Sequence, residues 1–236
     1  MIKIDKLSIV IPVFNEEKTI VKMVERVLNV DLGKIQKEII LVNDGSIDQT
    51  DKALAELKDK YNLIVIDYKK NMGKSCALRT GFEKVTGDVV VIQDGDLEYD
   101  PNDFKKMIFK MLESDDIRVV YGSRRLKKDN VQYSGLSFYM GGLLLTVMAN
   151  ILYGIKITDE PTCYKMFDVE VLKKINLKSR RFEFCPEVTA KVAKLHEKIY
   201  EVPILYSPRH ADQGKKIKLR DFFEAVWVLV KYRFVD

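Results

Sequence analysis

The sequence contains few of the residues that build disulfide frameworks and metal sites based on cysteine. Only Cys76, Cys163 and Cys185 are cysteines, and their odd number and wide spacing argue against a disulfide scaffold or a paired-cysteine zinc site. A reducing interior is the simplest interpretation. The two histidines, His196 and His210, have no nucleophile or metal partner at a recognisable spacing, and no serine or cysteine nucleophile signature supports covalent acyl chemistry.

A strong excess of charge is also missing. Forty Lys and Arg against thirty-five Asp and Glu leave a net charge of +5, which is too small for a protein whose main partner is nucleic acid.

The familiar nucleotide-binding loops are also missing. Gly73-Lys74-Ser75 resembles the end of a phosphate loop, but Tyr68 stands where that loop needs its first glycine, so Lys74 is interpreted as a surface lysine. No GxGxxG follows the first apolar run, and the N-terminus lacks a secretory cleavage site.

Apolar runs and helical patterns alternate through the first hundred residues. Continuous Ile and Val runs indicate strands buried on both faces, and the segments between them place apolar residues at helical spacing. This alternation predicts a parallel, doubly wound α/β sheet. The predicted strands are 7–14, 38–44, 63–68 and 88–96, and the predicted helices are 16–28, 48–60 and 74–85.

The remainder of the chain continues without a linker or repeat, so 1–236 is predicted to be one domain. Strands are expected at 117–123, 162–167 and 199–206, with helices at 101–112, 135–155, 186–195 and 219–234. Residues 135–155 carry no charge over 21 positions, which is long enough to span a bilayer. Gly141, Gly142 and Asn150 dilute the hydrophobicity of this segment, and we interpret it as a helix lying at an interface or in a core.

The sharpest chemical feature is Asp94-Gly95-Asp96, followed by Glu98, directly after a buried strand. Ligands of open α/β sheets bind at the carboxyl ends of the strands, so these carboxylates are predicted to face a ligand rather than form a solvated acidic turn. Hard oxygen ligands suit Mg²⁺ or Mn²⁺, which commonly bridges to substrate phosphates.

Two basic loops follow later strands. Arg124 and Arg125 come after the strand at 117–123, and Arg209, Lys215 and Lys216 come after the strand at 199–206. An arginine near a strand end can grip a phosphate or carboxylate with two parallel hydrogen bonds. Gly214 before the two lysines suggests a loop that folds over a ligand.

Taken in order, these segments resemble glycosyltransferase family 2, and within it the polyprenyl-phosphate (dolichol-phosphate) hexosyltransferases of the GT-A fold. The resemblance covers nearly the whole chain. It rests on Ile11 to Glu16, Val42 to Ser46, Gln93 to Glu98, Gly122 to Arg124, Thr158-Asp159 with Thr162 to Lys165, Glu183 to Glu187, Glu201 to Arg209 and Gly214 to Lys216.

The resemblance implies a GT-A (Rossmann-like) fold, a doubly wound mixed sheet flanked by helices with an interfacial amphipathic helix. Residues 1–98 would form the half that binds the nucleotide sugar and 99–236 the acceptor half. The implied donor-binding residues are Pro12, Phe14, Glu16, Asp44, Asp94, Arg209, Lys215 and Lys216; the metal ligands are Asp94, Asp96 and Glu98; the acceptor-binding residues are Arg124 and Arg125; and the catalytic residues are Asp94, Asp96, Arg124, Asp159 and Arg209.

The implied reaction is an inverting, Mg²⁺- or Mn²⁺-dependent transfer of a hexose from a UDP- or GDP-sugar to a polyprenyl phosphate. It would take place at the cytoplasmic face of a membrane, to which a cytoplasmic protein attaches peripherally, without any nucleic-acid partner. An anionic lipid phosphate needs no general base, whereas a saccharide hydroxyl would need one, for which Asp159 or Glu187 is the candidate. Asn43, where relatives usually carry Asp, and Met140, near where they often carry a second basic residue, depart from the family pattern.

Three alternatives remain at this stage. The first is a family 2 enzyme acting on a saccharide or other hydroxyl. The second is a non-catalytic protein that binds nucleotide sugars. The third is a phosphatase of the haloacid dehalogenase type, which is disfavoured because its paired aspartates normally follow the first strand rather than the fourth.

Overall fold

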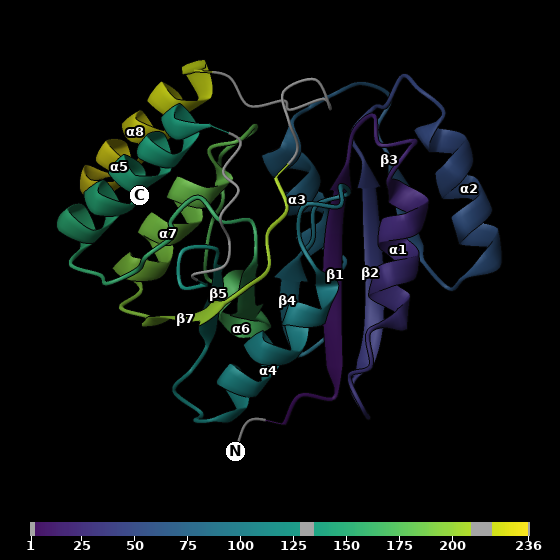
Figure 1. Cartoon of the computed structure of the whole chain (residues 1–236), viewed down its shortest axis with the longest axis horizontal. Coiled ribbons are helices and arrows are strands. Elements are labelled where there is room, and N and C mark those ends of the chain that lie inside the picture. The colour runs from purple at the N-terminus through teal and green to yellow at the C-terminus, as the bar shows by residue number, and fades with distance from the viewer. Residues whose placement is uncertain (1–2, 128–134, 209–218, 236) are drawn as a thin grey trace.

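A computed structural model describes residues 3–127, 135–208 and 219–235. Its core is one seven-stranded sheet with the order β3-β2-β1-β4-β6-β5-β7 (Figure 1). The strands are β1 (Lys6–Val13), β2 (Gln36–Asn43), β3 (Ile64–Asp67), β4 (Val89–Ile92), β5 (Val119–Ser123), β6 (Lys165–Asp168) and β7 (Ile199–Pro203). The helices are α1 (Ile20–Asn29), α2 (Thr50–Lys60), α3 (Lys74–Phe82), α4 (Phe104–Leu112) with the 3₁₀ turn η1 (Pro101–Asp103) before it, α5 (Leu136–Tyr153), α6 (Val169–Lys173), α7 (Phe184–Lys194) and α8 (Leu219–Phe234).

The first four strands are parallel, as the alternation of apolar runs and helices predicts. Val10 of β1 pairs with Ile40 of β2 on one side and with Ile92 of β4 on the other. The second half of the chain adds a strand of the opposite direction, because β6 runs antiparallel to both β4 and β5. The sheet is therefore mixed, as the resemblance to GT-A enzymes implies.

Alternate residues of the central strands point to opposite faces and bury two separate cores. Ile9 and Leu41 face α1, α2 and α4, whereas Val10 and Val42 face α3, α6 and α7. Both faces are covered, which explains why the strands read as unbroken apolar runs rather than as alternating patterns. The helix layers hold the sheet rigid and leave the carboxyl ends of the parallel strands at one edge.

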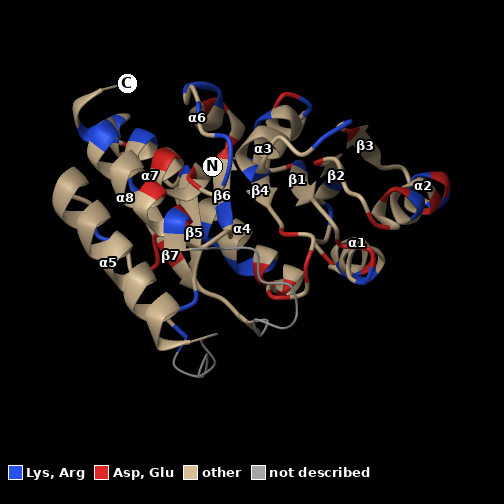
Figure 2. Ribbon diagram, turned by 90° about the horizontal axis from the view of Figure 1, so that it is seen from above, with Lys and Arg blue, Asp and Glu red and all other residues tan. Residues whose placement is uncertain are grey.

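Helices α5 and α8 form a further layer outside α7 (Figure 1). Leu145 and Ala149 of α5 pack against Ala225 and Leu229 of α8. The segment at 135–155 is indeed helical, and it ends at Gly154, whose φ of +66° is a left-handed conformation that favours glycine. In the view from above, α5 is an uncharged ribbon along one side of the molecule (Figure 2).

Candidate active site

A cleft of about 970 Å³ opens at the carboxyl edge of the sheet and extends to α5 and α8. Residues predicted from five separate segments of the sequence line this cleft, because the parallel strands deliver their carboxyl ends to one edge. They are Pro12, Phe14, Glu16, Asp44, Asp94, Asp96, Glu98, Arg124, Arg125 and Asp159. The predicted donor residues Arg209, Lys215 and Lys216 lie outside the described residues.

The Asp44 carboxylate fixes the wall of the cleft near β1 and β2, because it accepts hydrogen bonds from two backbone amides. Both Asp44 carboxylate oxygens accept hydrogen bonds, one from the amide of Met72 at 2.6 Å and one from that of Gly73 at 2.9 Å. Burial raises the pKa of Asp44, although these two hydrogen bonds oppose the rise. Gly73 has a φ of +101°, and a Cβ there would lie 2.3 Å from the Arg180 carbonyl oxygen, so only glycine fits.

Asn43, which departs from the family pattern, organises the loop after β2. Its side-chain oxygen accepts hydrogen bonds from the Ser46 amide at 3.2 Å and the Ser46 hydroxyl at 2.7 Å. Its amide nitrogen donates to Asp51 and, at 3.1 Å, to Asp67. An aspartate could not donate these two bonds and would add a third negative charge beside two others. The substitution therefore suits the local structure of this chain.

Asp94 is held by a lysine that the sequence interpretation placed on the surface. The Lys74 ammonium lies 2.5 Å from Asp94 Oδ1, and the two side chains are only 21% and 15% exposed. Burial alone would lower the pKa of Lys74, but the attraction of Asp94 and of the Cys163 sulfur raises it well above its usual value. Lys74 is thus a charged residue of the cleft, and the interpretation of it as a surface lysine was wrong.

Asp96 and Glu98 are held by contacts within their own turn and across the cleft. Asp96 Oδ1 accepts the Glu98 amide at 3.0 Å, and the Glu98 carboxylate accepts the Tyr206 hydroxyl at 2.7 Å. Among residues 3–127, 135–208 and 219–235, no group of three or more His, Cys, Asp or Glu side chains is arranged to hold a metal ion. The predicted set of three carboxylate ligands is therefore not assembled by the side chains alone.

The remaining pair, Asp94 and Asp96, still fits a divalent cation. Both line the same cleft, and the ammonium of Lys74 against Asp94 shows that a positive charge is stable at this position. Mg²⁺ is commonly bound through one or two carboxylates, with waters and substrate phosphates completing the coordination. The donor set therefore suits a cation that arrives together with a diphosphate.

Arg124 and Asp159 form a buried pair at the opposite wall. Arg124 donates from Nε and Nη2 to the two Asp159 oxygens, both at 2.7 Å, and its backbone amide donates at 2.9 Å. Burial opposes ionisation of Asp159, but Arg124 outweighs it, so the net pKa of this carboxyl is lowered. A fully buried carboxylate with a low pKa makes a poor general base. The geometry instead gives Asp159 the role of orienting Arg124.

Glu187, the other candidate base, is not part of the cleft. Its carboxylate accepts the amides of Lys178 and Ser179, both at 2.7 Å, and the Lys191 ammonium at 2.6 Å. These contacts hold the loop before α7 against that helix. The hypothesis that Glu187 acts as a base is therefore wrong, because its charge is already neutralised within α7.

Arg125 connects the basic loop to α5. Its guanidinium donates to the Tyr139 carbonyl at 3.1 Å and lies 4.7 Å from the centre of the Tyr139 ring. Gly142 lies close beside it, since a Cβ there would be 3.3 Å from the Arg125 guanidinium. The cleft thus joins a cationic wall to the uncharged helix.

Glu160 also lines the cleft and was not predicted. It is fully buried, and neither of its carboxylate oxygens makes a hydrogen bond of normal geometry within the described residues. Burial raises the pKa of Glu160 to about 8, although Lys165 opposes the rise. At neutral pH this side chain is therefore mostly an uncharged carboxylic acid.

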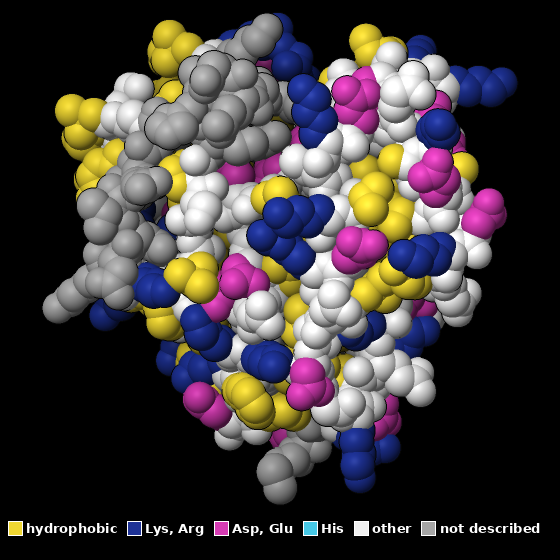
Figure 3. Space-filling model, turned by 45° about the vertical axis from the view of Figure 1, so that its right-hand side comes forward, with side chains coloured by type: hydrophobic (Ala, Val, Ile, Leu, Met, Phe, Trp, Pro, Cys, Tyr) yellow, Lys and Arg dark blue, Asp and Glu magenta, His cyan; other side chains and the backbone are white. Residues whose placement is uncertain are grey.

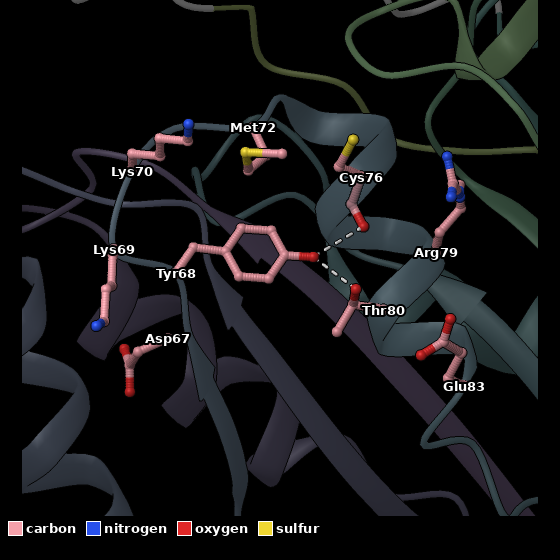
Figure 4. A pocket seen from close by; sticks show the side chains of 9 residues that line it. All are labelled: Asp67, Tyr68, Lys69, Lys70, Met72, Cys76, Arg79, Thr80 and Glu83. Carbon is pink, nitrogen blue, oxygen red and sulfur yellow. Dashed lines mark hydrogen bonds between the residues drawn. The ribbon is translucent and has the colours of Figure 1, made fainter.

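A second, smaller hollow of about 500 Å³ lies beside β3 and α3 (Figure 4). The Tyr68 ring lies in it, and the Tyr68 hydroxyl bonds the Cys76 carbonyl at 3.3 Å and the Thr80 hydroxyl at 2.5 Å. Asp67, the last residue of β3, and Glu83, which follows α3, are the acidic residues of its lining. The larger cleft, which gathers the predicted residues, is therefore the better candidate for the active site.

The surface charge does not indicate another site on the face that Figure 3 shows. Acidic and basic side chains are interspersed over that face, so neither sign of charge forms a large patch there.

Comparison with known proteins shows the family of this chain. The model of glycosyl transferase family 2 matches residues 8–176. A dolichyl-phosphate beta-glucosyltransferase of Trichomonas vaginalis is 28% identical, with 95% of this chain and 72% of that protein covered. A dolichol-phosphate mannosyltransferase of Pyrococcus furiosus is 30% identical, with 93% of this chain covered but only 61% of the relative.

A third relative is close to this chain in length. The UDP-N-acetylglucosamine–dolichyl-phosphate N-acetylglucosaminyltransferase of Methanococcus voltae is 31% identical, with 91% of this chain and 92% of that protein covered. Among solved structures, glucosyl-3-phosphoglycerate synthase of Mycobacterium tuberculosis bound to uridine diphosphate superposes with a TM-score of 0.75 at 17% identity, covering 98% of this chain and 81% of the synthase. Structures of that synthase have been solved with Mg²⁺ or with Mn²⁺. This chain belongs to glycosyl transferase family 2 and is a glycosyltransferase.

Proposed function

We propose that this protein transfers a hexose from a nucleoside diphosphate sugar to a polyprenyl phosphate. One observation carries the proposal: a single cleft runs from the acidic edge of the sheet to the apolar wall made by α5 and α8. Asp94 and Asp96 lie at one end, and Phe138, Leu145 and Phe222 line the other. A polar donor and a lipid acceptor could thus share one site. The names of the relatives support this assignment.

The donor would lie against Pro12, Phe14, Glu16 and Asp44, with its diphosphate toward Asp94 and Asp96. Mg²⁺ or Mn²⁺ held by these two aspartates would neutralise the charge that develops on the leaving diphosphate. Lys74, which forms an ion pair with Asp94, would add a further positive charge beside the diphosphate. The predicted roles of Arg209, Lys215 and Lys216 in covering the phosphates remain part of the proposal.

The acceptor phosphate would approach from the side of Arg124 and Arg125. Asp159 holds the Arg124 guanidinium in one orientation, so the positive charge is positioned before the acceptor arrives. A phosphate oxygen attacks the anomeric carbon as the bond from that carbon to the donor phosphate breaks. This displacement inverts the configuration and gives a β-linked glycosyl phosphate from an α-linked donor. Because the lipid phosphate is already anionic, no general base is required.

The α5 and α8 pair supports attachment to a membrane surface. Helix α5 is long and apolar enough to cross a membrane, with a mean hydropathy of 1.5, and only 17% of it is buried. Contact with α7 and α8 covers one side of it and leaves large apolar side chains exposed on the other. The exposed apolar residues of the two helices include Leu136, Leu144, Ile151, Phe223 and Trp227. We place this surface on the cytoplasmic leaflet, with the cleft opening beside it.

The test is a comparison of acceptors. Purified protein with Mn²⁺ would receive radiolabelled UDP- and GDP-hexoses, preselected by thermal shift, and either a polyprenyl phosphate or a panel of saccharides. We expect label to appear in the lipid fraction as a glycosyl phosphate. Label only in saccharide products would establish the hydroxyl-acceptor alternative, and donor binding without transfer to either acceptor class would favour the non-catalytic one.

A further inference from the structure

Two cysteines from distant segments meet in the wall of the active-site cleft. Cys163 lies in the loop before β6, and Cys185 is the second residue of α7. Both residues line the cleft and are partly exposed, and the Cys185 thiol donates a hydrogen bond at 3.5 Å to the carbonyl of Thr162, the residue before Cys163. The third cysteine, Cys76, lies apart from them on α3 and lines the smaller hollow in Figure 4. The proposed reaction uses neither member of the pair.

Positive charge surrounds this pair. The Lys74 ammonium lies 3.1 Å from Cys163 Sγ while it also binds Asp94. Interaction with the Cys163 side chain lowers the pKa of Cys185 to about 6, and the charges of Lys165 and Lys74 assist against the opposing effect of burial. Interaction with Cys185, together with burial, raises the pKa of Cys163. Cys185 is therefore the member of the pair that loses its proton more readily, and Cys163 is the member that keeps it.

We propose that Cys163 and Cys185 form a reversible dithiol–disulfide pair, a modification site in the cleft wall that reacts with low-molecular-weight disulfides. The Cys185 thiolate attacks the reagent, forms a mixed disulfide and releases one thiolate. The Cys163 thiol then loses its proton, attacks the Cys185 sulfur and releases the second reagent thiol. The two cysteines are oxidised by two electrons, and the reagent disulfide is reduced by two. Such reactive pairs are the usual form of disulfide in reducing compartments.

Oxidation would reach the cation site through Lys74. Oxidation removes the negative charge that the two thiols can carry between them, and a disulfide sulfur accepts a hydrogen bond only weakly, so Lys74 would lose the attraction of the pair and bind Asp94 more tightly. Asp94 would then be less available to a divalent cation. We therefore expect the oxidised protein to bind Mn²⁺ with uridine diphosphate about tenfold more weakly, the change that corresponds to one charged hydrogen bond. This second step rests on the proposed function, whereas formation of the disulfide does not.

The first experiment maps the disulfide. The full chain is incubated with oxidised glutathione, quenched by alkylation, digested without reduction and analysed by mass spectrometry. We expect a linked peptide containing Cys163 and Cys185, with a mass lower by the two thiol hydrogens, that separates on treatment with dithiothreitol. Cys76→Ser should form the same link, whereas Cys185→Ser should not. Glutathione attached mainly at Cys76, or the absence of a Cys163–Cys185 link, would overturn the proposal.

The second experiment measures binding by calorimetry, with reduced and oxidised protein compared in Mn²⁺ and uridine diphosphate. A loss of affinity that dithiothreitol restores, and that Cys185→Ser does not show, supports coupling through Lys74. Equal affinity in both states, with the disulfide present, would refute that coupling while leaving the modification site intact. If the reduced protein binds no nucleotide at all, the proposed function fails, and the disulfide map still tests the pair.

Discussion

Replacement of Glu160 by glutamine should make the protein more stable at neutral pH. The carboxyl is fully buried, and its pKa is raised from 4.5 to about 8 in the folded protein. Between these two values the unfolded chain releases the proton while the folded chain keeps it, so stability falls as the pH rises. Each pH unit in this window costs about 1.4 kcal/mol, which amounts to about 3 kcal/mol between pH 5 and pH 7. Glutamine has nearly the same shape as the neutral acid but carries no proton to lose.

The assay is urea unfolding of both proteins at several pH values. The difference in unfolding free energy between Glu160→Gln and the wild type should be small at pH 5 and should grow by about 3 kcal/mol by pH 7. Other ionisable groups are common to both proteins and cancel in the difference, apart from those that couple directly to Glu160, such as Lys165 and Cys185. As a matched control, Glu170→Gln changes a side chain that is 67% exposed and should show no such trend. A difference that does not vary with pH would refute the assignment of a neutral Glu160.

Three further outcomes follow from the same contacts. Asp159→Asn removes the counter-charge of a mostly buried arginine, Arg124, and should destabilise the protein by about 3 kcal/mol in urea unfolding. Asp96→Ala should lower kcat/KM by about 100-fold, on the order of 3 kcal/mol, and weaken Mn²⁺ binding in a titration; an unchanged rate would contradict the metal proposal. Trp227→Glu, at an apolar side chain 64% exposed on α8, should reduce flotation with anionic liposomes, whereas Val21→Glu on α1 should not.

Most of the fold could be predicted from residue patterns because the apolar periodicity is strong. The strands and helices of the first half occur where the patterns place them, with ends that differ by a few residues. The antiparallel direction of β6 could not be deduced in the same way, since it depends on where the chain turns back through irregular loops. Helix α6 was missed because it is short. Its start is marked only by Asp168, whose side chain accepts hydrogen bonds from the amides of Glu170 and Val171.

Some residues of the candidate cleft could be predicted from the sequence, but their pairings could not. The rule that ligands bind at strand ends brought Asp44, Asp94 and Arg124 to one cleft. It could not show that Lys74 binds Asp94 or that Asp159 grips Arg124, because these partners are distant in sequence and meet only through packing. The position of Lys74 directly after Gly73, at the start of a helix, was the one feature of the sequence that could have indicated a place for this lysine in the cleft. Tyr206, which bonds Glu98, had none.

The place of α8 has a consequence for biosynthesis. This helix covers the inner side of α5 and also packs on α7, yet it is the last described helix of the chain. During translation the apolar residues of α5 leave the ribosome well before α8 exists to shield them. The nascent chain therefore exposes the apolar surface of α5 until α8 has been synthesised. During that interval we expect a chaperone or the lipid bilayer to cover this surface.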